Sequence, residues 1–325
     1  MLQLSCKIEI EGSKKWIFEH TASCKIDRDS DSLISTCEII LPRKVKWANE
    51  NCCPLNNGDR IKVYLGYDGK NELAFDGYIV SIGMKTPVKL YCEDEMLKLK
   101  GSKMDYSVLN GGISNNDLLK LFTDKKVRCI DFELNEFFRT SCENVAAFLN
   151  YVMSFGPDKY FFRYLDGENT LVCLNIFTPN LAQVTNTFVY DDSINLIDIS
   201  DLEVFSPMDN NVYVCINVMA SVNHKRLRIE RGVKDRATKR FIYHKFLSDE
   251  DIANRLADYI IERESKTRLT GSFRTFGGKL AWPFDIAAIK IQGERMGKYI
   301  IRKNVITFGK NGFRQKITLG ELVDE

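Results

Sequence analysis

The strongest constraint on the fold is a series of alternating segments between Pro54 and Lys100. Every second residue is apolar in three segments, which contain Ile61, Val63 and Leu65, then Tyr78, Val80 and Ile82, and then Val88 and Leu90. Successive side chains of a strand point to opposite faces, so this period of two predicts half-buried β-strands. Turn residues separate the segments at Asn57-Gly58-Asp59, Asp68-Gly69 and Thr86-Pro87. We therefore expect an antiparallel meander that curls into a sandwich or barrel.

Two further alternating segments, residues 2–10 and 37–41, precede this meander. Together with it they predict a first β-barrel domain over residues 1–104. At 325 residues the chain has the length of about two domains. Its hydrophobic share of 44% is enough for substantial cores without disulfide bonds.

A different pattern follows the first domain. Thr140 and Glu143 have the spacing of a helix capping box. An apolar stripe at helical spacing then comprises Val145, Phe148, Leu149, Val152 and Met153. Gly156-Pro157 ends this helix, and residues 160–164 and 171–177 predict a hairpin around Asp166-Gly167. We therefore predict an α+β insert domain of helix plus hairpin over residues 105–195.

The β pattern returns after this insert and predicts a second β-barrel domain over residues 196–325. Strands are expected at residues 196–205, 212–218, 227–229, 241–246, 269–276, 286–291, 299–308 and 313–319. One helix is expected at about 248–265, with acidic residues in its first turn. Asn311-Gly312 predicts a tight hairpin. The fold class is thus mainly β, with two similar antiparallel barrels around an α+β module.

A faint repeat relates the two β domains. Asp59 and the alternating residues after it resemble Asp285 with Ala287, Ile289 and Ile291. Residues 77–80 likewise resemble residues 298–301. Any two meanders share such a pattern, so the repeat is a hypothesis at this point.

No catalytic, cofactor or metal site is indicated. The three histidines have no second histidine or cysteine at metal-ligand spacing. Nucleotide, hydrolase and metalloprotease motifs are missing, so we expect no enzymatic activity and no cofactor. The ten cysteines form no C-x-x-C pair, and Cys37, Cys92, Cys173 and Cys215 are expected to act as small apolar residues. Cys52-Cys53 is expected to be a pair of free thiols, with a vicinal disulfide as the alternative.

Residues 224–240 form a basic stretch with eight Lys or Arg residues against two acids. The simplest interpretation is a long solvated hairpin with Gly232 near its tip. Such a stretch also suits an electrostatic protein interface or a contact with nucleic acid phosphates. The candidate interface residues are Arg226, Arg228, Arg231, Lys234 and Arg236. The net charge of +2 favours neither nucleic acid nor a membrane surface for the chain as a whole.

The order of motifs in the first domain resembles that of phage tail baseplate hub proteins. The residues that carry the resemblance are Gly58-Asp59, the run Leu65-Gly66-Tyr67-Asp68-Gly69, Phe75 before Gly77-Tyr78-Ile79, and Cys92-Glu93-Asp94 before Met96 and Leu99. These are similar to the late control protein D-like family, which is related to the N-terminal part of type VI secretion spike proteins. The capped helix with its hairpin and the C-terminal residues 297–322 are similar to the same family.

The resemblance implies a homotrimer whose two barrels per chain build a pseudo-sixfold ring. That ring would join the hexameric tail tube to a trimeric spike, as the structural hub of a phage tail or contractile injection apparatus. The expected partners are the chain itself, the tube protein, a separate spike protein and other baseplate proteins. We expect no membrane partner and only transiting DNA, with assembly in the bacterial cytoplasm and residence in the virion tail. A tail-tip cell-wall hydrolase and a DNA-contacting tail module that uses residues 224–240 are the alternatives.

Overall fold

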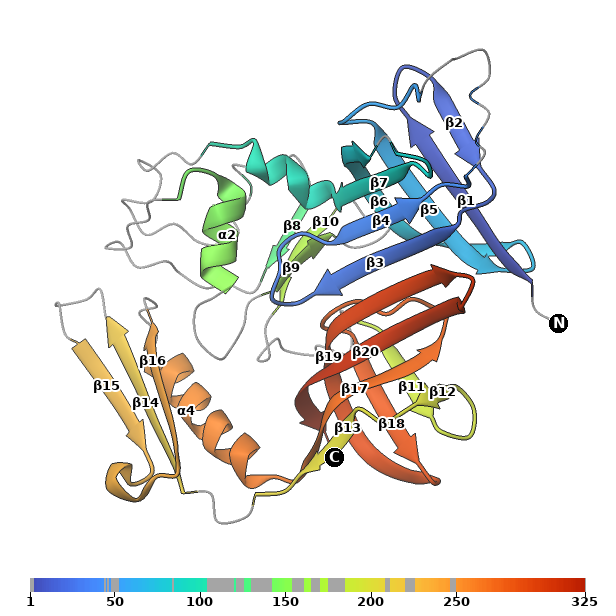
Figure 1. Cartoon of the computed structure of the whole chain (residues 1–325). Coiled ribbons are helices and arrows are strands. Elements are labelled where there is room, and N and C mark those ends of the chain that lie inside the picture. The colour runs from blue at the N-terminus through green and yellow to red at the C-terminus, as the bar shows by residue number, and fades with distance from the viewer. Residues whose placement is uncertain are drawn as a thin grey trace. The chain divides into compact units, whose positions relative to one another are not determined.

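A computed structural model of the chain describes residues 3–43, 45, 47, 53–83, 85–103, 120, 126–129, 142–153, 161–164, 170–174, 185–207, 211–219, 226–245 and 250–324 (Figure 1). The protein is mainly β and forms two compact units. Unit 1 is built from Met1–Lys98, Thr185–Leu202 and Gly271–Glu325, and unit 2 from Leu99–Val184 and Glu203–Thr270. No helix of the described residues is long and apolar enough to cross a membrane.

One large sheet organises unit 1. Its strands are β1 Leu4–Glu11, β2 Lys15–Phe18, β3 Ser23–Asp29, β4 Thr36–Ile40, β5 Arg60–Tyr67, β6 Lys70–Gly83, β7 Lys89–Asp94, β11 Thr187–Asp191, β12 Leu196–Asp198, β13 Leu202–Phe205, β17 Arg268–Phe276, β18 Ile286–Ile291, β19 Glu294–Gly309 and β20 Gly312–Asp324. The 3-10 helix η1, Glu95–Lys100, follows β7. The alternating segments of the predicted meander are confirmed as β5, β6 and β7, and the Asn311-Gly312 hairpin is confirmed between β19 and β20.

The sheet contains two repeats with the same strand order. In the first repeat, β3, β4, β7, β6, β5 and β1 are neighbours in that order. In the second repeat, β12, β17, β20, β19, β18 and β11 are neighbours in the same order, and they follow one another along the chain in the same sequence. One pairing differs in direction, because β1 and β5 are antiparallel whereas β11 and β18 are parallel.

The turns that lead into β5 and β18 have the same hydrogen bonds. Before β5, the Asn56 N–H donates to Asp59 Oδ2 at 2.9 Å, and the Asp59 N–H donates to the Asn56 carbonyl at 3.3 Å. Before β18, Trp282 and Asp285 form the same two bonds at 2.7 and 3.0 Å. Asp59 and Asp285 are therefore equivalent residues, as the repeat hypothesis assumed.

Each of these turns also binds the long strand that follows. The Gly58 N–H donates to the Ile79 carbonyl at 2.7 Å, and the Phe284 N–H donates to the Ile301 carbonyl at 2.8 Å. Gly58 and Phe284 both have positive φ, 93° and 69°, which suits glycine better than phenylalanine. Ile79 is thus the counterpart of Ile301, and the sequence alignment that set it against Ile300 was wrong by one residue.

A β-bulge occurs at the same place in both repeats. Ile79 pairs with Cys92 and Ser81 pairs with Tyr91, so Val80 is an extra residue in β6. The corresponding irregularity in β19 lies between Ile301 and Lys303. Because an extra residue reverses the alternation, β6 buries Ile79 and leaves Val80 37% exposed. The predicted alternation through Tyr78, Val80 and Ile82 is wrong, because the face that is buried before the bulge carries Phe75, Gly77 and Ile79.

The two repeats join where β3 and β19 lie side by side (Figure 1). Arg28 of β3 is buried there, and its guanidinium donates to the Ala74 and Ala281 carbonyls at 2.6 and 3.2 Å. The same group lies 3.6 Å from the ring centre of Trp282. The core of the first repeat also includes Ile306, Phe308 and Phe313 of the second. The strands of both repeats therefore belong to one sheet, and the domain bounds 1–104 and 196–325 stay a prediction.

The described residues of unit 2 include two small sheets and the α-helices α2 and α4. Its elements are β8 Lys126–Cys129, α2 Val145–Met153, β9 Phe161–Tyr164, β10 Thr170–Leu174, β14 Val212–Met219, β15 Arg226–Arg231, the 3-10 helix η4 Lys234–Arg236, β16 Lys239–Lys245 and α4 Glu250–Ser265. The sheets have the orders β8-β10-β9 and β15-β14-β16. The chain thus leaves the second repeat after β13 and returns to it at β17.

The predicted helix and hairpin of the insert are present. Val145, Phe148, Leu149 and Met153 of α2 are buried, which confirms the apolar stripe, while the side chain of Val152 lies outside the described residues. The helix begins later than predicted, because Asn144 is its N-cap and accepts the Ala147 N–H on Oδ1 at 2.9 Å. Thr140 and the turn Asp166-Gly167 lie outside the described residues. β9 and β10 form the expected antiparallel pair.

The helix α4 packs on the sheet of β14, β15 and β16. Leu256 and Ile260 share a buried cluster with Val214, Ile216 and Ile229. This confirms the apolar face predicted for a helix near 248–265. The predicted strand over residues 196–205 is two strands, β12 and β13. Cys37, Cys92, Cys173 and Cys215 are buried as expected, and Cys52 lies outside the described residues.

Candidate partner interface

The described part of the basic stretch, residues 226–240, contains β15, η4 and the first two residues of β16. Both strands pair with β14, which lies between them, so they form the two edges of this sheet. The prediction of one hairpin is therefore wrong, since β15 and β16 do not pair with each other. Gly232 ends β15 with a φ of +79°, and a Cβ at this position would collide with the Val212 carbonyl. The close approach of β14 thus explains the glycine in this turn.

Arg228 is engaged within its own sheet. Its Nη2 donates to Glu230 Oε1 at 2.6 Å and to the Tyr213 hydroxyl at 3.2 Å. The Tyr213 hydroxyl also donates to Glu230. These bonds from Tyr213 and Arg228 hold the pKa of Glu230 below its ordinary range, and the bonds to Tyr213 and Glu230 raise the pKa of Arg228. Arg228 and Glu230 are exposed while Tyr213 is buried, and the Arg228 charge is compensated within this cluster.

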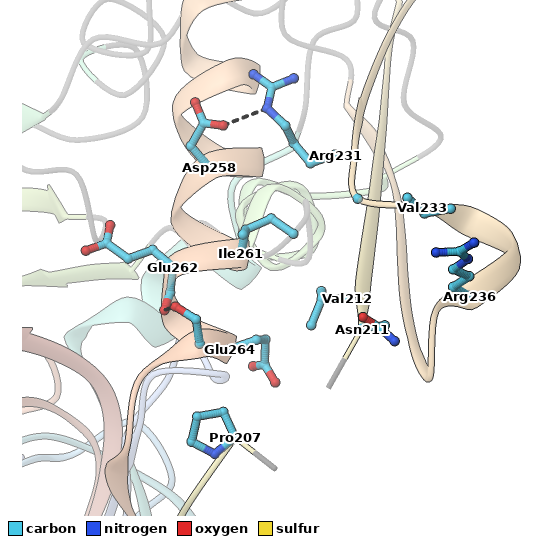
Figure 2. A pocket seen from close by; sticks show the side chains of 12 residues that line it. Pro207, Asn211, Val212, Arg231, Val233, Arg236, Asp258, Ile261, Glu262 and Glu264 are labelled. Atoms are coloured by element: carbon cyan, nitrogen blue, oxygen red, sulfur yellow. Dashed lines mark hydrogen bonds and ion pairs between the residues drawn. The ribbon is translucent and has the colours of Figure 1, made fainter. Parts of the chain in front are cut away.

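Arg231 is held by α4. Its Nε donates to Asp258 Oδ1 at 2.6 Å and its Nη2 donates to Asn254 Oδ1 at 3.0 Å. Figure 2 shows the guanidinium of Arg231 pointing to the carboxylate of Asp258 across the gap between β15 and the helix. Arg231 therefore fixes the edge strand β15 to the helix α4, and its charge is largely compensated by Asp258.

Lys234 and Arg236 are the candidate residues that remain exposed. Both lie in η4, which has no buried residue. Among the described residues, neither forms a salt bridge. The side chain of Arg226 lies outside the described residues. The structure thus divides the five candidates into two that are engaged, two that face solvent and one whose side chain is not described.

A cavity of about 900 Å³ lies beside this edge. Arg231 and Arg236 lie on the strand side, while Asp258, Glu262 and Glu264 come from α4 (Figure 2). Pro207, Asn211, Val212, Val233 and Ile261 also line it. The wall is therefore mixed in charge, with cations facing acids across an opening.

Glu264 is the buried acid of this region, with 4% of its surface exposed, and sequence reasoning missed it. Lys239 Nζ lies 3.0 Å from its Oε2, and Arg263 and Arg268 each lie 3.1 Å from its Oε1. Burial opposes ionisation, but these three cations outweigh it and lower the pKa of Glu264. Lys239 and Arg268 also stack on the ring of Phe205 at 4.5 and 4.0 Å. These contacts all lie within unit 2 and join Phe205 and Arg268 to β16 and the end of α4.

This arrangement suits binding through shape and charge. The acids around the cavity are paired with cations: Asp258 with Arg231, Glu262 with Lys266, and Glu264 with Lys239, Arg263 and Arg268. No cluster of metal-ligating side chains occurs among the residues that the structure describes. The spacing of charges in the sequence could identify the arginines of β15, but the α4 partners of Arg231 lie more than twenty residues later. Only the fold brings these groups together.

Comparison with known proteins gives a consistent structural result. No protein-family model and no curated protein matches this chain. A tail protein from Neisseria meningitidis covers 98% of this chain and 96% of its own, with a TM-score of 0.61 at 15% identity. The 43 kDa tail protein of prophage MuSo2 from Shewanella oneidensis covers 98% of both chains, with a TM-score of 0.61 at 12% identity.

A third solved structure extends this likeness to secretion systems. The c3393 protein of E. coli is a component of the type VI secretion system with structural similarity to the T4 bacteriophage tail proteins gp27 and gp5. It matches 97% of this chain and 76% of its own, with a TM-score of 0.55 at 9% identity. The likeness includes both units and both repeats, and it establishes that this chain has the fold of phage tail proteins.

Proposed function

We propose that this protein is a structural hub of a phage tail or related contractile injection apparatus. In this role it adapts a hexameric tail tube to a trimeric central spike. The observation that carries the proposal is the internal repeat, because three chains with two equivalent repeats each offer six similar surfaces. A sixfold tube could contact such a ring at every subunit, while a threefold spike could contact it once per chain.

The comparisons support this proposal through the fold. Tail proteins from two bacterial genomes share it over nearly the whole chain, and so does a secretion component described as similar to tail proteins. The proposed assembly is a homotrimer in the baseplate of the tail, in which each repeat closes as a barrel. Its partners are the tube protein, a separate spike protein and other baseplate proteins, and DNA passes through it without specific recognition.

The proposal assigns binding and no catalysis to the chain. Within the candidate interface, Lys234 and Arg236 are the residues placed to contact a partner, because they are exposed on η4. Arg228 and Arg231 act as positioning residues, since their bonds shape the edge of the sheet. An acidic surface on the tube or baseplate protein would complement η4.

Copurification with the products of neighbouring genes tests the function. A tagged chain should retain tube and spike proteins, and electron microscopy of assembled particles should place it between them. The variant Lys234→Glu with Arg236→Glu should weaken retention of one partner without lowering the melting temperature. A chain that is absent from tail particles, or that cleaves purified peptidoglycan, would contradict the proposal.

A further inference from the structure

The two repeats differ at one equivalent edge of the sheet. Residues 303–309 of β19 pair with β20 on one side and with β3 on the other. Their counterparts in β6 begin at Ser81, and residues 81–83 pair with β7 on one side. Within the described parts of the chain, no strand lies on the other side of residues 81–83. The second repeat thus has a neighbouring strand, β3, at an edge where the first repeat has none among the described strands.

A second open edge lies on β12 and β13, the counterparts of β3. β3 pairs with β4 and β19, whereas β12 and β13 pair with β17 as their one neighbour among the described strands. The Ser272 N–H donates to the Asp201 carbonyl at 3.2 Å, and this bond sets the register of the pair. The two antiparallel strands then place Val204 of β13 at the position that Arg28 holds in β3.

Equivalent residues of the two repeats differ in how deeply they are buried. Arg28 and Asn304 lie opposite each other at the β3–β19 junction, and both are fully buried. Their counterparts at the open edges are Val204, which is 60% exposed, and Ile82, which is half-buried. Apolar side chains on an unpaired strand edge favour the addition of another strand.

We infer that β12 and β13 of a second copy of this chain add to residues 81–83 of β6. This contact repeats between copies the pairing that β3 and β19 make within one copy. The two edges differ, so each copy gives one edge and accepts the other, and closure by rotation yields a ring. The inference rests on the proposed trimer and identifies the strands that join its chains.

The repeat also predicts the register and the chemistry of this contact. Asn304 pairs with Arg28, so Ile82 of one copy should lie opposite Val204 of the next. Within the chain, Lys303 reaches Asp27 and Asp29 at 3.0 Å each. Ser81 takes the place of Lys303 in β6, so the contact between copies lacks these ion pairs. We therefore expect it to depend on apolar contact and backbone bonds, with little sensitivity to salt.

Cysteine cross-linking tests this register. Ile82→Cys and Val204→Cys, combined in one chain and mildly oxidised, should give linked dimers and trimers on a non-reducing gel. Each single variant and the wild-type chain with its ten native cysteines should give none. The matched control combines Ile82→Cys with Ile242→Cys. Ile242 is 56% exposed, close to the 60% of Val204, but it lies on β16. Equal linking in the control, or none in the test pair, would overturn the inference.

Light scattering supplies a test without new thiols. The wild-type chain should have the mass of three copies at high concentration, and Val204→Arg should shift it to one copy. At dilutions where both chains are single, the two should have the same melting temperature. Ile242→Arg should keep the wild-type mass. A wild-type chain that remains single at every concentration, or a Val204→Arg chain that still associates, would overturn the proposed edge. A chain found in tail particles without cross-linking would reject this edge and leave the hub function standing.

Discussion

The two repeats of unit 1 share their central strands and differ at their margins. In both, an aspartate turn leads into the first strand of a three-stranded meander, and a bulge follows at the same position. The margins differ because β3 continues directly to β4, whereas the chain between β13 and β17 forms part of unit 2. The comparison shows that hydrogen-bond geometry is retained at the centre while the outer strands are adapted to different neighbours.

The same turn also has different burial in each repeat. Asp285 is fully buried and accepts the Asn186 N–H on Oδ1 at 3.1 Å, which fixes the start of β11. Asp59 is half-buried and lies against Gly12, where a Cβ would collide with its carboxylate. One residue type in one turn therefore holds a parallel strand in the second repeat and the end of an antiparallel strand in the first.

The largest expected effect comes from Arg28, which has no buried charged counterpart in the second repeat. Arg28→Ala removes the donors to the Ala74 and Ala281 carbonyls and leaves a cavity beside Trp282. We expect a loss of about 3–5 kcal/mol in the free energy of unfolding. Val204→Ala, the matched change in the second repeat, should cost less than about 0.5 kcal/mol because the side chain is exposed.

Urea denaturation of both variants, at concentrations where single copies predominate, checks this difference. Equal losses would show that the β3–β19 junction is no more strongly held than the open edge. That result would remove the physical basis for treating Arg28 as the residue that closes the junction.

The aspartate turns provide the next test. Asp285→Ala removes a fully buried carboxylate and leaves the part-buried Asn186 and Trp282 N–H groups without their acceptor, and we expect a loss of about 2–4 kcal/mol. Asp59→Ala removes one bond at a more exposed site and should cost about 1 kcal/mol. In hydrogen exchange, the amides of β11 should be the first to lose protection in Asp285→Ala. Equal costs for the two variants would mean that burial does not distinguish the turns.

A smaller effect is expected from Lys303, whose place in the first repeat is taken by Ser81. Lys303→Met removes partly exposed ion pairs with Asp27 and Asp29 and should cost about 1 kcal/mol or less. The loss should shrink as salt is added, because salt screens the pairs that the wild type retains. Ser81→Ala serves as the control and should show no salt dependence. In 1 M salt the screening length is roughly 3 Å. If Lys303→Met costs the same free energy of unfolding there as at low salt, the effect does not come from the ion pairs.

The sequence predicted the central strands because their signals are local. The alternation of Ile61, Val63 and Leu65 and the Asn311-Gly312 turn depend on neighbouring residues, and the structure confirms both. The bulge at Val80 could not be predicted, because the unpaired residue becomes visible once β7 is placed beside β6. The parallel partner of β18 and the interruption of the second repeat are likewise determined by contacts between distant segments.

The candidate interface was predicted from charge density alone. That signal found Arg228 and Arg231, yet both are engaged by Glu230 and Asp258. The exposed pair, Lys234 and Arg236, lies on the short helix after Gly232. Glu264 of α4 carries no local signal in the sequence, because one of its three cationic neighbours, Lys239, comes from the strand β16. Counting charges in a sequence thus locates a basic edge without showing which charges are already compensated.

The smallest expected effect concerns pH and belongs to the first repeat. Asp94, at the end of β7, accepts the Ser35 N–H on Oδ2 at 2.9 Å and the Met96 N–H on Oδ1 at 3.1 Å. Burial raises the pKa of Asp94 to about 6, although these hydrogen bonds act in the opposite direction. The folded chain therefore takes up this proton at a higher pH than the unfolded chain.

The contribution of Asp94 to the free energy of unfolding must consequently grow as the pH falls through 6 toward the ordinary pKa of an aspartate. Between pH 7 and pH 6 we expect a gain of a few tenths of a kcal/mol in the free energy of unfolding. Asp94→Asn removes the titrating group, so the difference between wild type and variant should change by this amount over that interval. Urea denaturation at several pH values measures it. A difference that stays constant, or that moves in the opposite direction, would show that the end of β7 does not carry this burial penalty.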